Sequence, residues 1–134
     1  MANQTVTRTA ETELEPSVIY TILADPYNIP KWAPLFADSV ERTDATHLSL
    51  TKGGQTFRAE VRMHHSAFAA DYIREMANNQ RGGAYIRVMP RPLGGSTVVM
   101  TVPLGPTTTE ADVAKTLNEE LSSLIQLGHS RGQK

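Results

Sequence analysis

The chain has 134 residues, of which 40% are hydrophobic and 20% charged, with a formal net charge of −1 and no cysteine. This length fits a single domain spanning residues 1–134, whose core is expected at about residues 4–128. The balanced charge excludes the basic footprint of a nucleic-acid-binding protein. The absence of cysteine excludes disulfides, thiolate nucleophiles and thiolate zinc sites.

The N-terminal segment, MANQTVTRTAETE, is polar and has no apolar signal core. No window approaches the roughly 18 apolar residues that a membrane span needs. The sequence therefore predicts a cytoplasmic protein with no membrane span.

The first elements are a strand and two short helices. Residues 5–14 alternate and are rich in β-favouring types, which indicates a strand. Pro16 suits the first position of a helix, and Asp25 ends that helix because it precedes Pro26. Pro26 begins a second short helical turn, which Pro30 limits in the same way.

Six strands are then expected in hairpin succession, at residues 35–43, 46–51, 55–64, 69–76, 82–89 and 96–102. The glycine pairs at 53–54, 82–83 and 94–95 each precede a strand and are interpreted as hairpin turns, with the second falling in a connection at 78–83. None fits a phosphate-binding loop, because no helix follows to hold an anion.

The strand at 55–64 has the clearest period of two. Its apolar side chains should share one face, and this set consists of Phe57, Ala59, Val61 and Met63. By the same parity His65 points inward and His64 outward. A metal site is not expected, because neighbouring strand residues cannot both bind one ion and a third ligand is missing.

The C-terminal segment predicts a helix of about 19 residues that starts after the N-cap Thr109 and ends at Gly128. Its apolar stripe consists of Val113, Leu117, Leu121, Leu124 and Ile125. Short turns make the strands antiparallel, and the long helix is left to cover the apolar face of the sheet. The fold class is therefore α+β, with a curved antiparallel sheet of about seven strands wrapped around this helix. A gap between sheet and helix would form a cavity.

The element order resembles the START-like helix-grip superfamily, also called SRPBCC. The resemblance rests on the LADP-x-x-x-P-x-W stretch at 23–32, the hairpin signals of RGGAYIRVMPRPLGGSTVVMTV and the final leucine helix. It covers about residues 4–128 and points to the small bacterial members labelled polyketide cyclase/dehydrase-like. It is specific for the fold and weak for activity, because the family has no shared catalytic motif.

The resemblance implies that a small hydrophobic or aromatic ligand, lipid-like or polyketide-like, binds between the sheet and the C-terminal helix. The expected ligand-binding residues are Trp32, Phe57, Val61, Met63, Met100, Leu117 and Leu121. Trp32 has two interpretations, a lid over the cavity mouth or a pin that holds the short helix to the sheet. No cofactor is expected, and a homodimer is left open.

Two alternative functions are kept. A cyclase/dehydratase-type enzyme would use pocket acid/base groups, for which His65 and Tyr72 are the catalytic candidates. The favoured interpretation of His65 is a strand-end histidine partly in water, and that of Asp71 and Arg74 is a pair of solvated edge charges. The third function is a protein-interaction module like the co-chaperone relatives of the superfamily.

Overall fold

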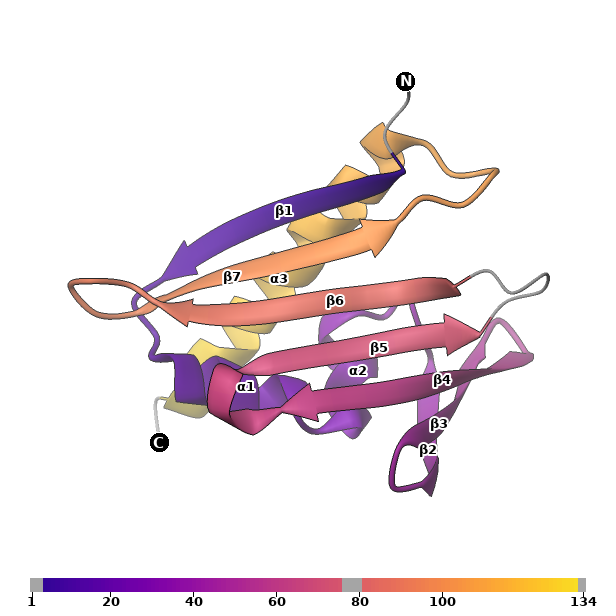
Figure 1. The fold of residues 1–134 in the computed structure, drawn as a ribbon, viewed down its shortest axis with the longest axis horizontal. Helices are drawn as coiled ribbons and strands as arrows, with labels where there is room; N and C mark the ends of the chain where they lie inside the picture. Colours follow the sequence, from indigo (N-terminus) through magenta and orange to yellow (C-terminus); the bar gives the residue numbers. More distant parts are fainter. Residues whose placement is uncertain (1–3, 76–80, 133–134) are drawn as a thin grey trace.

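The computed structural model describes residues 4–75 and 81–132, and its centre is a curved antiparallel sheet of seven strands (Figure 1). The order across the sheet is β1-β7-β6-β5-β4-β3-β2. The strands are β1 (Thr5–Thr12), β2 (Ser39–Asp44), β3 (His47–Lys52), β4 (Gln55–His64), β5 (Ala69–Glu75), β6 (Arg81–Pro90) and β7 (Ser96–Pro103).

Each strand from β2 to β6 pairs with the next in the chain, which confirms the hairpin succession. The β3–β4 turn places Lys52 opposite Gln55, and its central residues Gly53 and Gly54 both have positive φ, as a two-residue hairpin requires. β1 pairs with β7, so that Thr5 lies opposite Pro103 and the two ends of the sheet-forming segment are side by side.

Three short helical pieces follow β1: α1 (Pro16–Leu23), η1 (Pro26–Asn28) and α2 (Ile29–Trp32). α1 begins at Pro16, as predicted, and Asp25 caps η1 by accepting a hydrogen bond of 3.0 Å from the Tyr27 amide. The expected limit at Pro30 is wrong, because this proline occupies the second position of α2. A proline there removes no helical hydrogen bond.

The long helix α3 (Glu110–Gly132) packs against β1, β7, α1 and α2 (Figure 1). Thr109 caps it through its hydroxyl, which accepts from the Asp112 amide at 3.2 Å. Its buried side chains recur at spacings of three and four: Ala114, Leu117, Leu121 and Leu124. The predicted end at Gly128 is wrong. Gly128 lies within α3, and a Cβ there would lie 2.8 Å from a Leu14 methyl carbon, so the glycine allows Leu14 to pack closely against the helix.

Two further expectations about the sheet are wrong. Asp71 and Arg74 lie on β5, the central strand, and not at an edge. Gly82 and Gly83 lie within β6 and not in a turn; the rest of the predicted connection, residues 78–80, is outside the described residues. The fold class itself is confirmed as an α+β helix-grip arrangement. Within the described ranges, no helix has both the length and the apolar character needed to cross a bilayer.

Candidate functional site

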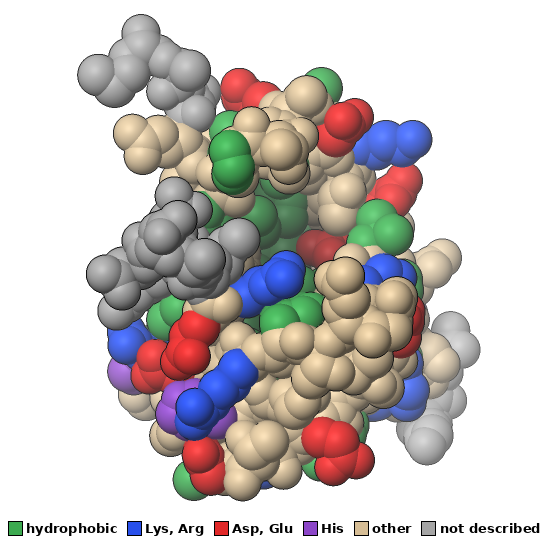
Figure 2. Space-filling view, turned by 90° about the vertical axis from the view of Figure 1, so that its right-hand side faces the viewer, with side chains coloured by type: hydrophobic (Ala, Val, Ile, Leu, Met, Phe, Trp, Pro, Cys, Tyr) green, Lys and Arg blue, Asp and Glu red, His purple; other side chains and the backbone are tan. Residues whose placement is uncertain are grey.

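A cavity of about 480 Å³ lies between α2, the strands β5 to β7 and the first half of α3. Its wall is mostly apolar, and the loop between β7 and α3 adds small and polar residues such as Gly105 and Thr108. Figure 2 shows this side of the molecule, with hydrophobic side chains inside a hollow and charged side chains of both signs around it. Its volume falls in the range of roughly 300–1,000 Å³ typical of small-molecule sites.

Small residues on β6 leave room for the cavity. Gly82 lies opposite Arg74 on β5, and Ala84 lies opposite Tyr72. All four residues line the cavity. Between them Gly83 has a φ of +110°, and a Cβ there would come within 1.9 Å of the Tyr72 carbonyl oxygen, so only glycine fits. Gly82 and Ala84 carry too little side chain to fill the space that Arg74 and Tyr72 border.

Trp32 forms the α2 side of the cavity. Its side chain is buried, with 3% exposed, and it lines the cavity together with Ile29 from the same short helix. It therefore packs into the core and also borders the space where a ligand would lie. Its Nε1–H is buried without a hydrogen-bond partner among the described residues.

Arg74 brings a positive charge to the sheet side of the cavity. Its guanidinium carbon lies 3.9 Å from the centroid of the Phe57 ring, which in turn makes an edge contact with Phe36, a cavity residue. Within the described part of the chain, Arg74 has no ion pair, and its buried Nε has no hydrogen-bond partner. A cation–π contact therefore holds the guanidinium in place without neutralising it.

Glu120 brings a carboxyl group to the helix side of the same cavity. Burial raises its pKa to about 7, and the nearby charge of Glu119 adds to this shift. No hydrogen bond or ion pair joins Glu120 to any other residue that the structure describes. The cavity thus contains Arg74 and Glu120, two groups of opposite sign that are not paired with each other, and the exposed Asp112 also borders it.

Tyr72, one of the two predicted catalytic residues, lines the cavity but its hydroxyl is engaged. It donates a hydrogen bond of 2.5 Å to the Leu23 carbonyl at the end of α1. Burial raises its pKa, so the phenol stays protonated. Its proton therefore serves the contact between β5 and α1, and a catalytic role for Tyr72 stays a prediction.

The predicted inward orientation of His65 is wrong. β4 ends at His64, and His65 begins the short helical turn η2 (His65–Ala67), so the parity of the strand does not extend to it. Both histidines are exposed, and His65 does not line the cavity. Its Nδ1 lies 3.0 Å from the Tyr20 hydroxyl. This position gives no support to a catalytic pair of His65 and Tyr72.

The other predicted ligand-binding residues divide into two groups. Trp32 and Leu117 line the cavity, whereas Phe57 does not line it but contacts Arg74 and Phe36, which do. The remaining four are packed in the core away from the cavity wall: Val61, Met63, Met100 and Leu121.

Arg74 and Glu120 were not predicted as site residues, although the sequence holds a signal for each. Glu120 lies three residues after Leu117 and four before Leu124, which places a carboxyl group on the apolar stripe of α3. Arg74 has the parity of Tyr72 on β5, so both side chains must lie on the same face of the sheet. In both cases a charged residue occupies a position where the periodicity of its helix or strand predicts a buried side chain.

No protein-family model matches the chain, and no curated protein sequence matches it either. Solved structures do match. The ZhuI aromatase/cyclase from Streptomyces sp. R1128 is 12% identical with a TM-score of 0.67, over 96% of this chain and 94% of that one. A START superfamily protein from Mycobacterium smegmatis is 16% identical with a TM-score of 0.61, over 96% and 97%. The chain has the START-like helix-grip fold.

The START-like fold also occurs in StfQ, a di-domain aromatase/cyclase from the steffimycin biosynthetic pathway. This chain is 15% identical to it with a TM-score of 0.70, and the match covers 96% of this chain and 46% of StfQ. At these identities the likeness establishes the fold alone. The activity of this START-like chain has to be argued from its own cavity.

Proposed function

We propose that this START-like chain binds a small, mostly apolar molecule in the cavity between α2, the sheet and α3. The observation that carries the proposal is the cavity itself, which has about 480 Å³ of space and a largely apolar wall. Burial of apolar ligand surface in such a space contributes roughly 25 cal/mol per Å². A ligand with the area of two or three aromatic rings would therefore bind measurably.

The sole tryptophan provides the test, because Trp32 lines the cavity. Titration with the neutral fluorophore N-phenyl-1-naphthylamine should raise the emission of the fluorophore at a stoichiometry of one. It should also quench Trp32 by energy transfer. Binding that leaves Trp32 emission unchanged would place the ligand elsewhere and contradict the proposal.

A pair of phenylalanine variants locates the site. Ala84→Phe adds a ring inside the cavity, whereas Ala111→Phe adds the same ring on the exposed side of α3. We expect Ala84→Phe to weaken binding of the fluorophore by at least about tenfold, since it fills space that the ligand needs. Ala111→Phe should leave the affinity unchanged. Equal affinities in the two variants would count against the cavity as the site.

A second candidate function is proton transfer on a carbonyl compound, of the kind a cyclase or dehydratase performs. One observation favours it: Glu120 has a pKa near 7 and shares the cavity with Arg74, which has no ion pair among the described residues. A carboxylate with this pKa can remove a proton next to a carbonyl group, and a guanidinium can stabilise the resulting enolate oxygen. This arrangement differs from the predicted pair of His65 and Tyr72.

The enzyme candidate is tested by hydrogen–deuterium exchange at the carbon next to the carbonyl of 2-tetralone, followed by NMR in D₂O. If the chain catalyses proton transfer, Glu120→Gln should slow the catalysed exchange by about 10²–10⁴-fold. Glu119→Gln, an exposed neighbour on the same helix, is the matched control. Exchange no faster than in buffer would leave ligand binding as the function.

A further inference from the structure

Arg74 and Glu120 line the cavity and lack charged partners among residues 4–75 and 81–132, which the structure describes. Arg74 stacks on the face of Phe57 and its buried Nε has no hydrogen-bond partner there, and Glu120 makes no hydrogen bond or ion pair with any described residue. Elsewhere on the same strand the situation differs, because Asp71 on the opposite face of β5 pairs with Arg87 at 2.6 Å. Buried ionisable groups are normally paired, so an unpaired one in a cavity marks a place where a ligand group can lie.

We propose that the cavity selects apolar or aromatic molecules that carry one carboxylate group, which pairs with Arg74 while Glu120 takes up a proton. The inference rests on the proposed function, since it requires that the cavity bind a small molecule. It goes beyond that function by assigning the chemical class of the ligand and a coupling between binding and pH.

Arg74 determines the anionic part of the ligand. A guanidinium presents two parallel N–H donors that match the two oxygens of a carboxylate, and such charge-assisted pairs are stronger than neutral hydrogen bonds. Arg74 is already fixed by its stacking on Phe57, so little side-chain freedom is lost when an anion binds. The surrounding wall is mostly apolar, which suits the remainder of an aromatic or aliphatic acid.

Glu120 determines the response to pH. Its pKa of about 7 is due first to burial and then to Glu119, so the carboxyl group is half protonated near neutral pH. A ligand carboxylate in the same cavity would repel the charged form and raise this pKa further. Binding of the anion should therefore take up a proton, and the affinity should fall as the pH rises through 7.

The other ionisable groups near Glu120 do not replace it in this role. The groups that face it or lie on elements packed against α3 are Arg74 and Tyr72 on β5, Asp112 and Glu119 on α3, Tyr20 on α1, Lys31 on α2, and Arg8 and Glu11 on β1. β7 contributes none. Asp112 is exposed, so solvent screens its charge from the ligand. His65 lies outside the cavity.

The test compares two ligands of the same shape, 2-naphthoate and 2-naphthamide, in competition with N-phenyl-1-naphthylamine. 2-Naphthoate stays ionised between pH 6 and 8, so any change of affinity in this range belongs to the protein. We expect the acid to bind at least about tenfold more tightly than the amide at pH 6, and this preference to shrink at pH 8. Calorimetry in phosphate and Tris should detect uptake of up to about half a proton per acid bound at pH 7.

Variants assign each part of the effect. Arg74→Leu should abolish the preference for the acid and Arg74→Lys should keep part of it, whereas Arg58→Leu, which removes an exposed arginine from β4, should leave it intact. Glu120→Gln should abolish proton uptake and the pH dependence, and Glu119→Gln should retain most of both.

The outcomes separate the two proposals. If N-phenyl-1-naphthylamine binds but the acid and the amide compete equally, the ligand class is wrong and the binding function stands. A preference for the acid without proton uptake would overturn the role of Glu120. If the fluorophore does not bind either, the proposed function fails and the inference fails with it.

Discussion

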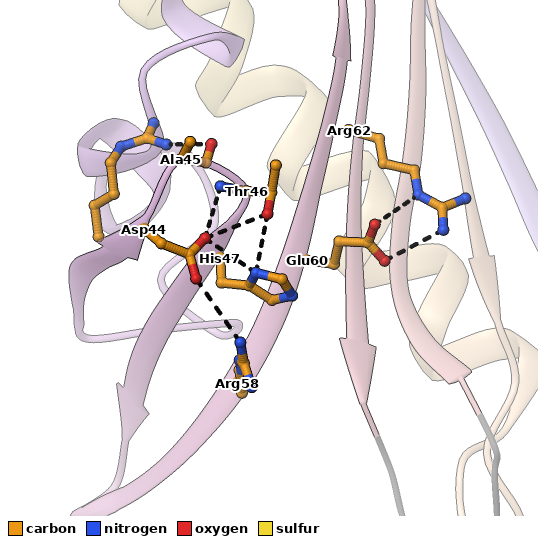
Figure 3. A network of polar contacts seen from close by, with 8 residues as sticks. Asp44, Ala45, Thr46, His47, Arg58, Glu60 and Arg62 are labelled. Carbon is orange, nitrogen blue, oxygen red and sulfur yellow. Dashed lines mark hydrogen bonds and ion pairs between the residues drawn. The ribbon is translucent and has the colours of Figure 1, made fainter.

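The charged side chains on β2 to β4 and those in the cavity differ in how the fold treats them. Figure 3 shows the first group. Asp44 accepts hydrogen bonds from the Thr46 amide at 2.8 Å and the Thr46 hydroxyl at 3.2 Å, and His47 Nδ1 lies 3.0 Å from the same oxygen. Arg58 lies 3.9 Å from its other oxygen. The hydrogen bond from the Thr46 amide, followed by that with His47, lowers the pKa of Asp44 to about 2.

Arg74 and Glu120 lie in a mostly apolar cavity and have no such partners in the part of the chain that the structure describes. The pKa shifts run in opposite directions, because hydrogen bonds stabilise the charged form of Asp44 whereas burial destabilises the charged form of Glu120. The comparison indicates that the charged side chains of the exposed network find their hydrogen-bond and ion-pair partners within the fold. In the cavity, Arg74 and Glu120 are left for a ligand to pair with, which lowers the stability of the ligand-free protein.

The largest expected effect comes from placing one more unpaired charge on the cavity wall. Leu117→Asp puts a carboxylate at a position that is 1% exposed, packed on the apolar side of α3. Burial of an unpaired charge removes several kcal/mol from a total stability of about 5–15 kcal/mol, so we expect the protein to unfold or nearly unfold. Thermal melts followed by circular dichroism measure this.

Asn118→Asp is the control for that variant, because the next residue of the helix is exposed. It should melt within a few degrees of the parent. If Leu117→Asp also melts within a few degrees of the parent, the α3 stripe does not pack on the sheet and the helix-grip arrangement is contradicted.

A second, smaller effect concerns the stability contribution of Glu120. Its pKa is raised from 4.5 in the unfolded chain to about 7 in the fold, so the native state binds the proton more tightly. The free energy of unfolding is therefore highest below pH 4.5 with respect to this group, and falls as the pH rises towards 7. The loss amounts to at most about 3 kcal/mol, less any screening by solvent at this partly exposed side chain.

Glu120→Gln should remove this loss. We expect the variant to be more stable than the parent at pH 8 and to melt several degrees higher, with little difference at pH 4.5. Urea unfolding at both pH values gives the comparison, and Glu119→Gln serves as the matched change on the exposed side. A variant that is no more stable than the parent at pH 8 would mean that the Glu120 carboxylate is well solvated or paired.

The smallest effect is expected in the exposed network. Asp44→Asn removes the charge but keeps an oxygen acceptor, and exposed ion pairs contribute little to stability. Because its pKa is lowered, Asp44 stabilises the fold above about pH 4, and this contribution is lost as the pH falls towards 2. We expect the variant to melt within a few degrees of the parent at pH 7. A large drop in melting temperature would show that the network matters as much as the cavity.

The arrangement of strands and helices was predictable because the hydrophobic period, and the glycine and proline residues between elements, depend on local structure. The alternation at 55–64 and the leucine spacing of α3 each describe one face of one element, and both are confirmed. The prediction of a helix end at Gly128 is wrong because the role of this glycine depends on a distant contact with Leu14, which no local pattern contains. The prediction of a turn at Gly82 and Gly83 is wrong for a similar reason, since Gly83 is required by its close approach to the Tyr72 carbonyl on β5.

The cavity was harder to predict because it depends on space that side chains from different elements leave unfilled. Its space arises where small residues of β6 lie opposite Tyr72 and Arg74, and this requires the register of β5 and β6. The parity of His65 failed because the strand ended one residue earlier. Glu120 could have been predicted as a site residue from the sequence, since a carboxyl group on the apolar stripe of a helix is unusual.

The ionisation of Glu120 is the measurement that tests the cavity most directly. Its side-chain carboxyl carbon can be followed by ¹³C NMR across a pH titration and assigned by comparison with Glu120→Gln. We predict a midpoint near pH 7 in the free protein and a higher midpoint when 2-naphthoate is bound. A midpoint near about 4.3, the value of a solvated glutamate, would contradict the burial of this group. A midpoint that 2-naphthoate does not move would contradict its place beside the bound acid.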